Sequence, residues 1–239
     1  MDTSIDNFLN GKVRLIQDKN GYRATSDSVL LASAVRAKSG DSILDVGTGT
    51  GVILYCLNAR IPHLKLTGIE KQTELYQHAC QNAELNDCSP TFICEDITTP
   101  SSTIHGQQFH HVVTNPPYYT ENLLRENKQT AQAYHQIIDL SYWISYCLKH
   151  LRAKGTFTII HRTEALPEIL NILSKSALGA IEVIPIFSKE GKPCKRIIVR
   201  GIMGSKKPFV LHSGLIIHRK DNTRTEIAEK IMRNGEQLE

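Results

Sequence analysis

A run with the order Asn-Pro-Pro-Tyr occupies residues 115–118, directly after the apolar stretch 112–114. Asn115 offers a side-chain carbonyl, and Pro116, which has no N–H to donate, offers a main-chain carbonyl from a nearly fixed φ. Two such acceptors can hold an amide-like or arylamine NH2 group so that its poorly nucleophilic lone pair turns toward an incoming methyl group. Tyr118 adds a flat face for the target group. Taken alone, the run is equally compatible with a turn that ends a strand and exposes a tyrosine.

A glycine-rich turn about 70 residues earlier strengthens the chemical reading. Residues 42–46 read as a buried strand, and the glycines that follow let the chain turn sharply and let a ligand approach the backbone. The pattern Gly-x-Gly-x-Gly departs from the Gly-x-Gly-x-x-Gly fingerprint of dinucleotide-binding proteins, which favours S-adenosylmethionine over NAD. With the run 115–118, the turn predicts methyl transfer to a planar nitrogen. Its candidate cofactor contacts are Asp45, Gly47, Thr48 and Gly49.

Acidic residues end the next two predicted strands. The strand 66–69 ends at Glu70, where a carboxylate can accept hydrogen bonds from both hydroxyls of a ribose. The strand 91–94 ends beside Asp96, which is placed to accept from the adenine amine of a cofactor. A single acid of this kind is more often a solvated surface group. Three strand-end acids in register with the glycine turn and the run 115–118 reverse that preference.

These segments together resemble the class I S-adenosylmethionine-dependent methyltransferases of the small-domain, amino-methylating group. Residues 17–31 more closely resemble the N-terminal segment of the bacterial tRNA1(Val) adenine-37 N6-methyltransferase family, and the resemblance extends from about residue 8 to the end. It implies that this segment closes over the methionine part of the cofactor, with roles for Tyr22 and Asp27, and that Asn115 also contacts the cofactor. Asp27 can equally be a charge that favours the N-terminal dipole of a helix.

Two stretches depart from the family pattern. Many relatives carry an aspartate just before the strand of the Asn-Pro-Pro-Tyr run, where this chain has His110 and His111. The later loop often reads Ala-Arg-His-Glu, whereas residues 133–136 read Ala-Tyr-His-Gln. The second change questions the substrate-side loop more than the chemistry. Adjacent strand residues point to opposite faces, so we expect the two histidines to pack in the sheet or at the surface and to hold no metal.

The alternation of strand-like and helical patterns predicts an α/β fold, a Rossmann-like, doubly wound sheet of seven strands with the last strand inserted antiparallel. At 239 residues the chain can form one methyltransferase domain. We expect an N-terminal segment (1–40), a Rossmann-like core (41–203) and a basic C-terminal extension packed on the core (204–239). The expected helices are 26–36, 51–60, 73–85, 139–151, 164–176 and a closing helix 221–233 capped by Asn222 and Thr223, and the expected late strands are 156–160, 182–187 and 195–202.

No signal sequence or membrane span is visible, which predicts a cytoplasmic protein. Six cysteines without a Cys-x-x-Cys pair suggest reduced thiols rather than a zinc site or a disulfide framework.

Charge is distributed unevenly along the chain. Residues 1–150 hold 12 Lys or Arg and 15 Asp or Glu, a net of −3, whereas 151–239 hold 16 and 9, a net of +7. A basic C-terminal third suggests a polyanionic partner, and a base in a single-stranded tRNA or other RNA loop is extracted at the least cost. We expect a monomer with no obligate protein partner. The candidate RNA contacts are Lys189, Lys192, Lys195, Arg196, Lys206, Lys207, Arg219, Lys220 and Arg224.

Three functions stay open from sequence. The leading one is adenine-N6 methylation of RNA, most plausibly of tRNA. The same run can also methylate a protein glutamine, although that group usually carries a helical recognition domain ahead of the glycine turn, and only about 40 residues precede Asp45 here. A non-catalytic RNA-binding or scaffold protein of the same fold is the third, and failure to bind S-adenosylmethionine would support it.

Overall fold

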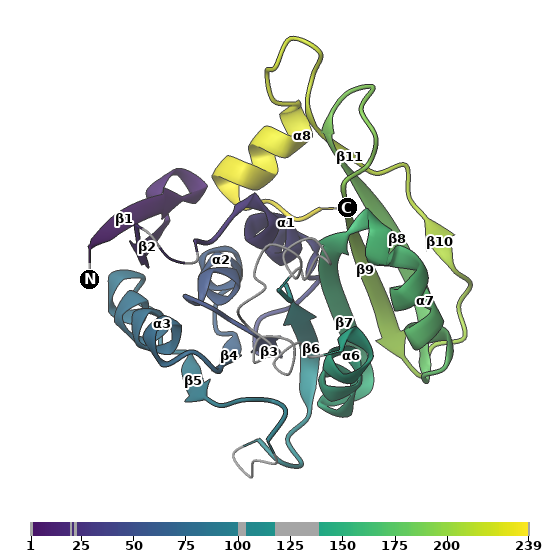
Figure 1. Ribbon diagram of the computed structural model, residues 1–239, viewed down its shortest axis with the longest axis horizontal. Helices are drawn as coiled ribbons and strands as arrows, with labels where there is room; N and C mark the ends of the chain where they lie inside the picture. The colour runs from purple at the N-terminus through teal and green to yellow at the C-terminus, as the bar shows by residue number, and fades with distance from the viewer. Residues whose placement is uncertain (1, 20, 22, 100–103, 118–138, 239) are drawn as a thin grey trace, which may run out of the picture.

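A computed structural model describes residues 2–19, 21, 23–99, 104–117 and 139–238. Its centre is a sheet with helices on both faces (Figure 1). Seven strands of this sheet follow the spatial order β5-β4-β3-β6-β7-β9-β8. Their bounds are β3 (Ser42–Val46), β4 (Lys65–Glu70), β5 (Thr91–Cys94), β6 (Phe109–Thr114), β7 (Leu151–Arg162), β8 (Leu178–Lys189) and β9 (Arg196–Met203).

Strand direction confirms the Rossmann-like α/β expectation. Neighbours from β5 to β7 are parallel, whereas β9 is antiparallel to both β7 and β8. The last of the seven strands is therefore inserted antiparallel between two strands that precede it in the chain. Two short strands that the sequence did not suggest, β10 (Val210–Leu211) and β11 (Leu215–His218), pair parallel to β8 along its outer side.

Side chains that alternate along the strands supply one core to each face of the sheet. Ile43 and Val113 join the cluster that contains α1 and α2, whereas their neighbours Leu44 and Val112 join the cluster that contains α6 and α7. Within the described residues, no helix has the length and apolar character that membrane crossing requires. The helices are α1 (Ser26–Ala34), α2 (Val52–Arg60), α3 (Thr73–Leu85), α6 (Leu140–Lys149), α7 (Leu166–Ser174) and α8 (Glu226–Glu229).

The N-terminal segment forms its own two-stranded antiparallel hairpin, β1 (Thr3–Phe8) and β2 (Val13–Asp18). Two asparagines, Asn82 on α3 and Asn86 directly after its last residue, tie this hairpin to the core. Asn82 is fully buried, accepts from the Ile16 N–H at 2.7 Å and donates back to the Ile16 carbonyl at 3.3 Å. Asn86 makes the same pair of bonds two residues earlier on β2. The amides therefore satisfy this edge of the hairpin as a neighbouring strand would.

The closing helix expected over residues 221–233 begins later than the sequence predicted. The helix α8 starts at Glu226, and the hydroxyl of Thr225 caps it. The proposed caps, Asn222 and Thr223, lie in the preceding turn, where Asn222 has a φ of 70°. A left-handed residue cannot continue a right-handed helix, so the helix cannot begin at residue 221.

The end of the chain is fastened to α1. A π-helical turn (Lys230–Asn234) follows α8, and its Ile231 packs in the same cluster as α1 and α2. The Leu238 N–H donates to the Ser33 carbonyl at 2.9 Å. Figure 1 shows the yellow C-terminal helix lying over α1, between the N-terminal hairpin and the outer strands.

Candidate functional site

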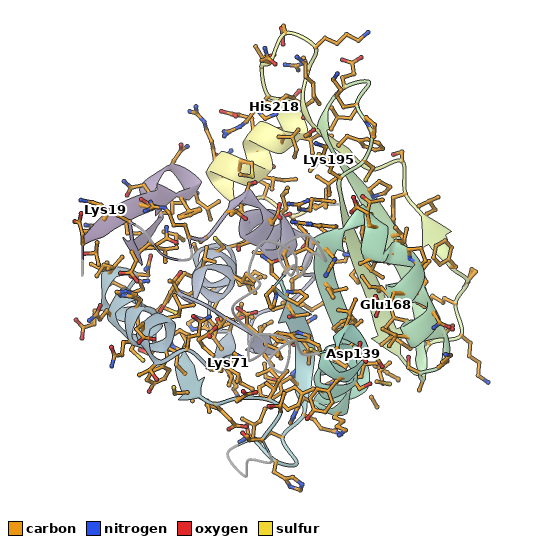
Figure 2. All side chains as sticks on the ribbon, viewed as in Figure 1. Lys19, Lys71, Asp139, Glu168, Lys195 and His218 are labelled. Atoms are coloured by element: carbon orange, nitrogen blue, oxygen red, sulfur yellow. The ribbon has the colours of Figure 1, made fainter. Side chains whose placement is uncertain are left out.

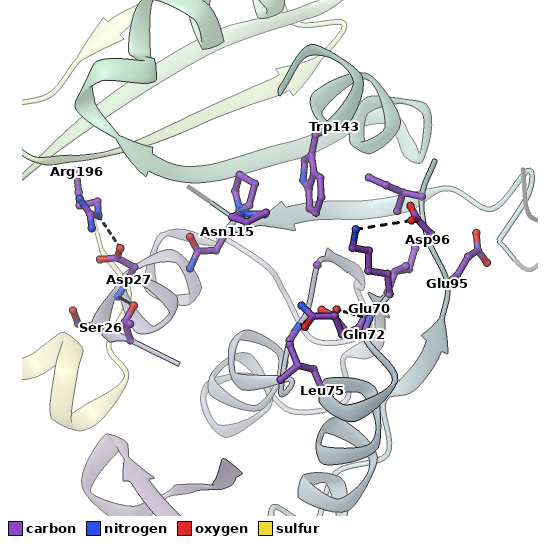
Figure 3. Close-up of a pocket in the computed structure, with 18 residues that line it drawn as sticks. Ser26, Asp27, Glu70, Gln72, Leu75, Glu95, Asp96, Asn115, Trp143 and Arg196 are labelled. Carbon is purple, nitrogen blue, oxygen red and sulfur yellow. Dashed lines mark hydrogen bonds and ion pairs between the residues drawn. The ribbon is translucent and has the colours of Figure 1, made fainter. Parts of the chain in front are cut away.

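The candidate site lies where the order of strands in the sheet reverses. From β3 the chain moves outward through β4 to β5, and it then returns to the other side of β3 as β6. In open α/β sheets, ligands bind at the carboxyl ends of the strands at such a switch point. A cavity of about 460 Å³ opens at this place (Figure 3). Its volume is in the range of small-molecule binding sites.

The turn after β3 forms part of the cavity wall, to which Gly47 and Gly49 contribute. Gly47 has a φ of 73°, and a Cβ at this position would lie 2.9 Å from the Trp143 ring. Both the conformation and the space therefore require glycine there. The N–H groups of Gly47 and Thr48 both donate to the Ile69 carbonyl at 2.9 Å, which holds the turn against β4.

Asp45 and Thr48 lie behind this turn and not on the cavity wall. The Thr48 hydroxyl donates to Asp45 Oδ2 at 2.7 Å, whereas Asp45 Oδ1 has no hydrogen-bond partner in the described part of the chain. Burial raises the pKa of Asp45 to about 7; the bond from Thr48 opposes the rise, and the nearby charge of Glu70 adds to it. An unpaired buried acceptor next to the turn suits a polar group of a ligand or a water that the ligand holds.

Glu70 ends β4 with a buried carboxylate whose two oxygens are both oriented by the main chain. Oε2 accepts from the Gly49 N–H and Oε1 from the Gln72 N–H, each at 2.9 Å. Each carboxylate oxygen has a second lone pair that can accept from a ligand. The side chain lines the cavity, so it presents a fixed pair of acceptors there.

Asp96 lies on the same side of the cavity, beyond the end of β5 (Figure 3). Its Oδ1 accepts from the N–H and the hydroxyl of Thr98, at 2.9 and 2.8 Å, and Lys71 lies 4.0 Å from Oδ2. Burial pushes the pKa of Asp96 upward, but these hydrogen bonds and the lysine charge outweigh it, so the pKa lies below its ordinary value. Asp96 is therefore an ionised acceptor at neutral pH.

Asn115 and Pro116 follow the carboxyl end of β6 and line the cavity together with Pro117. Asn115 is half-buried, whereas Pro116 is buried. The cavity thus joins the first part of the Asn-Pro-Pro-Tyr run to the glycine turn and to two of the three strand-end acids, Glu70 and Asp96. Other sequence-based candidates lie outside the described residues: Tyr22, Tyr118 and residues 133–136.

Trp143 is a cavity residue that the sequence analysis did not identify. It comes from α6, and its Nε1 donates to the Thr114 hydroxyl at 2.8 Å. Thr114 in turn donates to the Val46 carbonyl at 2.8 Å, so this chain of bonds links α6 to the ends of β6 and β3. The only signal in the sequence is that Trp143 is the single tryptophan of the chain.

Asp27 and Arg196 close the end of the cavity beside Asn115 (Figure 3). Asp27 lies in the first turn of α1, and its Oδ2 accepts from Arg196 Nε at 2.8 Å. Both sequence-based readings of Asp27 thus describe its position, because it is at a helix N-terminus and on the cavity wall. Arg196, expected from sequence only as a contact for a polyanion, begins β9 and reaches the cavity because β9 is inserted into the sheet.

The two histidines lie at the amino end of β6, away from the cavity. His111 Nε2 is 3.0 Å from Asp41 Oδ2, and His110 Nε2 is 3.7 Å from Asp41 Oδ1. Both rings therefore reach one carboxylate, each at a different oxygen; His111 is buried and His110 is half-buried, and the pairing of β6 with β7 shifts in register between Phe109 and His111. Burial lowers the pKa of His111, against the opposing effect of the hydrogen bond that Asp41 accepts from it. No group of three or more potential ligands among the described residues could hold a metal ion.

Comparison with known proteins identifies relatives of the chain. The family model described as methyltransferase small domain matches residues 23–184. A tRNA1(Val) (adenine(37)-N6)-methyltransferase of Actinobacillus pleuropneumoniae serotype 7 is 23% identical over 222 residues, which cover 91% of each chain. The enzyme of that name from Glaesserella parasuis serovar 5 is 28% identical over 187 residues, covering 77% of this chain and 78% of the relative.

Solved structures with the same fold include one from Agrobacterium tumefaciens, described as a predicted O-methyltransferase. Its TM-score is 0.72 at 24% identity, and the match covers 89% of this chain and 98% of that one. At this identity the likeness extends to the fold alone.

Proposed function

The chain belongs to the methyltransferase small-domain family, and we propose that it transfers the methyl group of S-adenosylmethionine to N6 of an adenine in tRNA. One observation carries this proposal: Asn115 and Pro116 line the same cavity as Glu70 and Asp96, at the switch point of the sheet. Relatives that align over most of the chain are named for this reaction.

The cavity fits the proposed cofactor chemically. The paired oxygens of Glu70 suit the two hydroxyls of a ribose, and the ionised Asp96 suits the exocyclic amine of the cofactor's adenine. Gly47 and Gly49 leave the backbone open to a ligand, and Asp27 faces the other end of the cavity, where the methionine part would lie. When bound, S-adenosylmethionine supplies an electrophilic methyl group on its sulfonium sulfur.

Asn115 and Pro116 would orient the target amine. The NH2 of adenine has two hydrogens and a lone pair delocalised into the ring. Two fixed acceptors hold both hydrogens and turn the lone pair out of conjugation, which is catalysis by orientation and by electrostatics. Thr114, the residue just before Asn115, is bonded to Trp143 and to the Val46 carbonyl. These two bonds support the proposal that the acceptor pair is held in a fixed position.

The proposed substrate is an adenine in a single-stranded loop of tRNA. A base in a loop is already partly unstacked, so extracting it costs less than extracting one from a duplex. We place this reaction in the cytoplasm and propose that a monomer performs it. Glutamine methylation and a non-catalytic role are the competing outcomes of the test below.

The test uses radiolabelled S-adenosylmethionine with total RNA and, in a parallel reaction, total protein from a bacterial strain that lacks this protein, followed by nucleoside analysis of the RNA. Labelled N6-methyladenosine confined to the tRNA fraction is the expected result. Label in a protein fraction and none in RNA would replace the proposal with glutamine methylation. No label in either, together with no cofactor binding, would leave the non-catalytic function.

Cofactor binding can be followed separately through the single tryptophan. Trp143 lines the cavity and is only 8% exposed, so we expect S-adenosylmethionine to change its fluorescence. Binding by calorimetry without a fluorescence change would place the cofactor elsewhere.

A further inference from the structure

Two loops at one end of the sheet carry more net positive charge than the whole chain. We name them, with the strand ends that flank them, the basic rim: residues 188–196, from the end of β8 to the start of β9, and residues 218–224, from the end of β11 to just before α8. Together they hold seven Lys or Arg and two Asp or Glu, a net of +5, against +4 for all 239 residues. The rest of the chain therefore has a net charge of −1. The basic residues are Lys189, Lys192, Lys195, Arg196, Arg219, Lys220 and Arg224.

The two loops are held together by specific bonds. Within the strands, His218 pairs with Lys189, and the Glu190 N–H donates to the His218 carbonyl at 2.9 Å. Lys189 Nζ donates to Asn222 Oδ1 at 2.7 Å, a bond between the loops that leaves the lysine charge uncompensated. Figure 2 labels Lys195 and His218 on these neighbouring loops. The rim is therefore a built surface and not a chance overlap of two tails.

The basic rim begins at the candidate site. The strand β8 is antiparallel to β9, and β9 is antiparallel to β7, so β8 ends at the same edge of the sheet as β3 and β6. Arg196, the last residue of the range 188–196 and the first of β9, lines the cavity and bonds to Asp27 beside Asn115. A polyanion on the rim would thus reach the end of the cavity at which the target amine is oriented.

Much of this charge faces solvent. Lys192, Lys195 and Lys220 are exposed, and no carboxylate of a described residue lies within 4.0 Å of their ammonium groups. Neither acid of the rim, Glu190 or Asp221, lies within 4.0 Å of the charged nitrogen of a described Lys or Arg. Asp221 instead accepts from the N–H and hydroxyl of Thr223. Exposed lysines on a rigid surface attract phosphates over a Debye length and carry no sequence preference.

We propose that the basic rim binds the sugar-phosphate backbone of the RNA outside the methylated base and so anchors the substrate while the base enters the cavity. This inference rests on the proposed function. It also divides the basic residues suggested by sequence into two groups. Lys206 and Lys207 follow the far end of β9, where the Ala180 N–H near the start of β8 donates to the Lys207 carbonyl. They therefore lie at the opposite edge of the sheet and take no part in the rim.

The test compares two triple variants of the full chain that remove the same charge. The rim variant is Lys192→Gln, Lys195→Gln and Lys220→Gln. The control variant, Lys175→Gln, Lys206→Gln and Lys207→Gln, changes exposed lysines at the opposite edge, after α7 and after β9. Binding of labelled bulk tRNA is measured across a series of KCl concentrations.

We expect the rim variant to bind tRNA roughly tenfold or more weakly at low salt and to lower the slope of log K against log salt by about 2 to 3, since each lost phosphate contact removes close to one released counterion. The control variant should stay within about twofold of the unmodified chain. S-adenosylmethionine binding should not change in either. In the methylation assay the rim variant should raise KM for tRNA and keep kcat, because the cavity is intact.

Equal tRNA binding by the two triple variants would overturn the rim proposal while leaving the function intact, provided that the unmodified chain still methylates RNA. An unmodified chain that neither binds nor methylates tRNA would overturn both. Phosphatidylserine vesicles serve as a second polyanion. If only the rim variant loses vesicle binding while its tRNA binding is unchanged, the surface is a lipid contact and the RNA proposal is wrong.

Discussion

At Asn115 the proposed chemistry depends on one side-chain carbonyl. Methylation needs the amine to be held, whereas cofactor binding draws on the glycine turn, Glu70 and Asp96. We therefore expect Asn115→Ala to abolish methyl transfer and to leave S-adenosylmethionine affinity within about tenfold, which is roughly 1.4 kcal/mol. The measurements are methylation of tRNA and titration calorimetry on the same preparation. Equal loss of both would make Asn115 a cofactor or folding residue.

Asp45 carries a second prediction, on the pH dependence of stability. Its pKa is about 7 in the folded chain against an ordinary value of 3.8, so the folded state keeps a proton that the unfolded chain releases. The stability that this proton contributes is fully present below the ordinary pKa and is lost as pH rises through about 7. Asp45→Asn cannot titrate. The free energy of unfolding of the unmodified chain, minus that of the variant, should therefore fall by up to about 1.4 kcal/mol per pH unit between the ordinary pKa of 3.8 and a pH of about 7.

Urea unfolding at several pH values across the window measures this difference without cofactor present. The comparison of two chains cancels titrating groups that they share, such as His161, whose pKa burial lowers to about 4. A difference that does not vary with pH would show that Asp45 is ionised in the folded state.

At the scale of elements, one buried ion pair joins the two strands that deliver Arg196 to the cavity. Arg200 on β9 is 3% exposed and lies opposite Glu182 on β8, with Nη2 at 2.5 Å from Oε2. Its Nη1 donates to the Ala34 carbonyl at 2.8 Å, which connects the strands to the end of α1. His212, which follows β10, also reaches Glu182, at 2.9 Å. The ion pair therefore connects β8 and β9 to the end of α1 through Arg200, and to the segment after β10 through His212.

Removing the charge of Glu182 would leave the Arg200 guanidinium buried without its counterion. We expect Glu182→Gln to lower the free energy of unfolding by about 2 to 4 kcal/mol, because an unpaired buried charge costs more than the pair contributes. The matched control is Glu190→Gln, on an exposed acid eight residues further along the chain, which should change stability by less than about 0.5 kcal/mol. Urea unfolding measures the free energy of unfolding of both variants. Equal changes in the two variants would mean that solvent reaches Arg200.

For the whole molecule, we propose that residues 1–239 fold as one domain. The hairpin is tied to α3 through Asn82, and the chain end is tied to α1 through Leu238, so both ends share contacts with the core. We expect urea unfolding followed by Trp143 fluorescence and by far-ultraviolet circular dichroism to give one coincident transition. A circular dichroism change that precedes the fluorescence change would show that an end segment unfolds on its own.

The sequence by itself determined the fold class and the chemical theme. Buried parallel strands are continuous apolar runs, and left-handed turns select glycine, so the strand at 42–46 and the turn at Gly47 and Gly49 are local signals. The acceptor pair at Asn115 and Pro116 is likewise a property of residue type. Asn222 and Thr223 were wrongly predicted to cap the closing helix, because which polar residue of that stretch becomes the cap depends on backbone conformation.

The tertiary structure alone decided which distant residues meet. Arg196 reaches Asp27 because β9 is inserted between β7 and β8, and Trp143 reaches Thr114 because α6 packs across the end of β6. The separation of the basic residues into the rim and the opposite edge follows in the same way from the direction of β9. Each of these contacts joins residues that are far apart in the chain, and no local pattern encodes them, because strand order and inserted direction are set by the packing of the whole sheet.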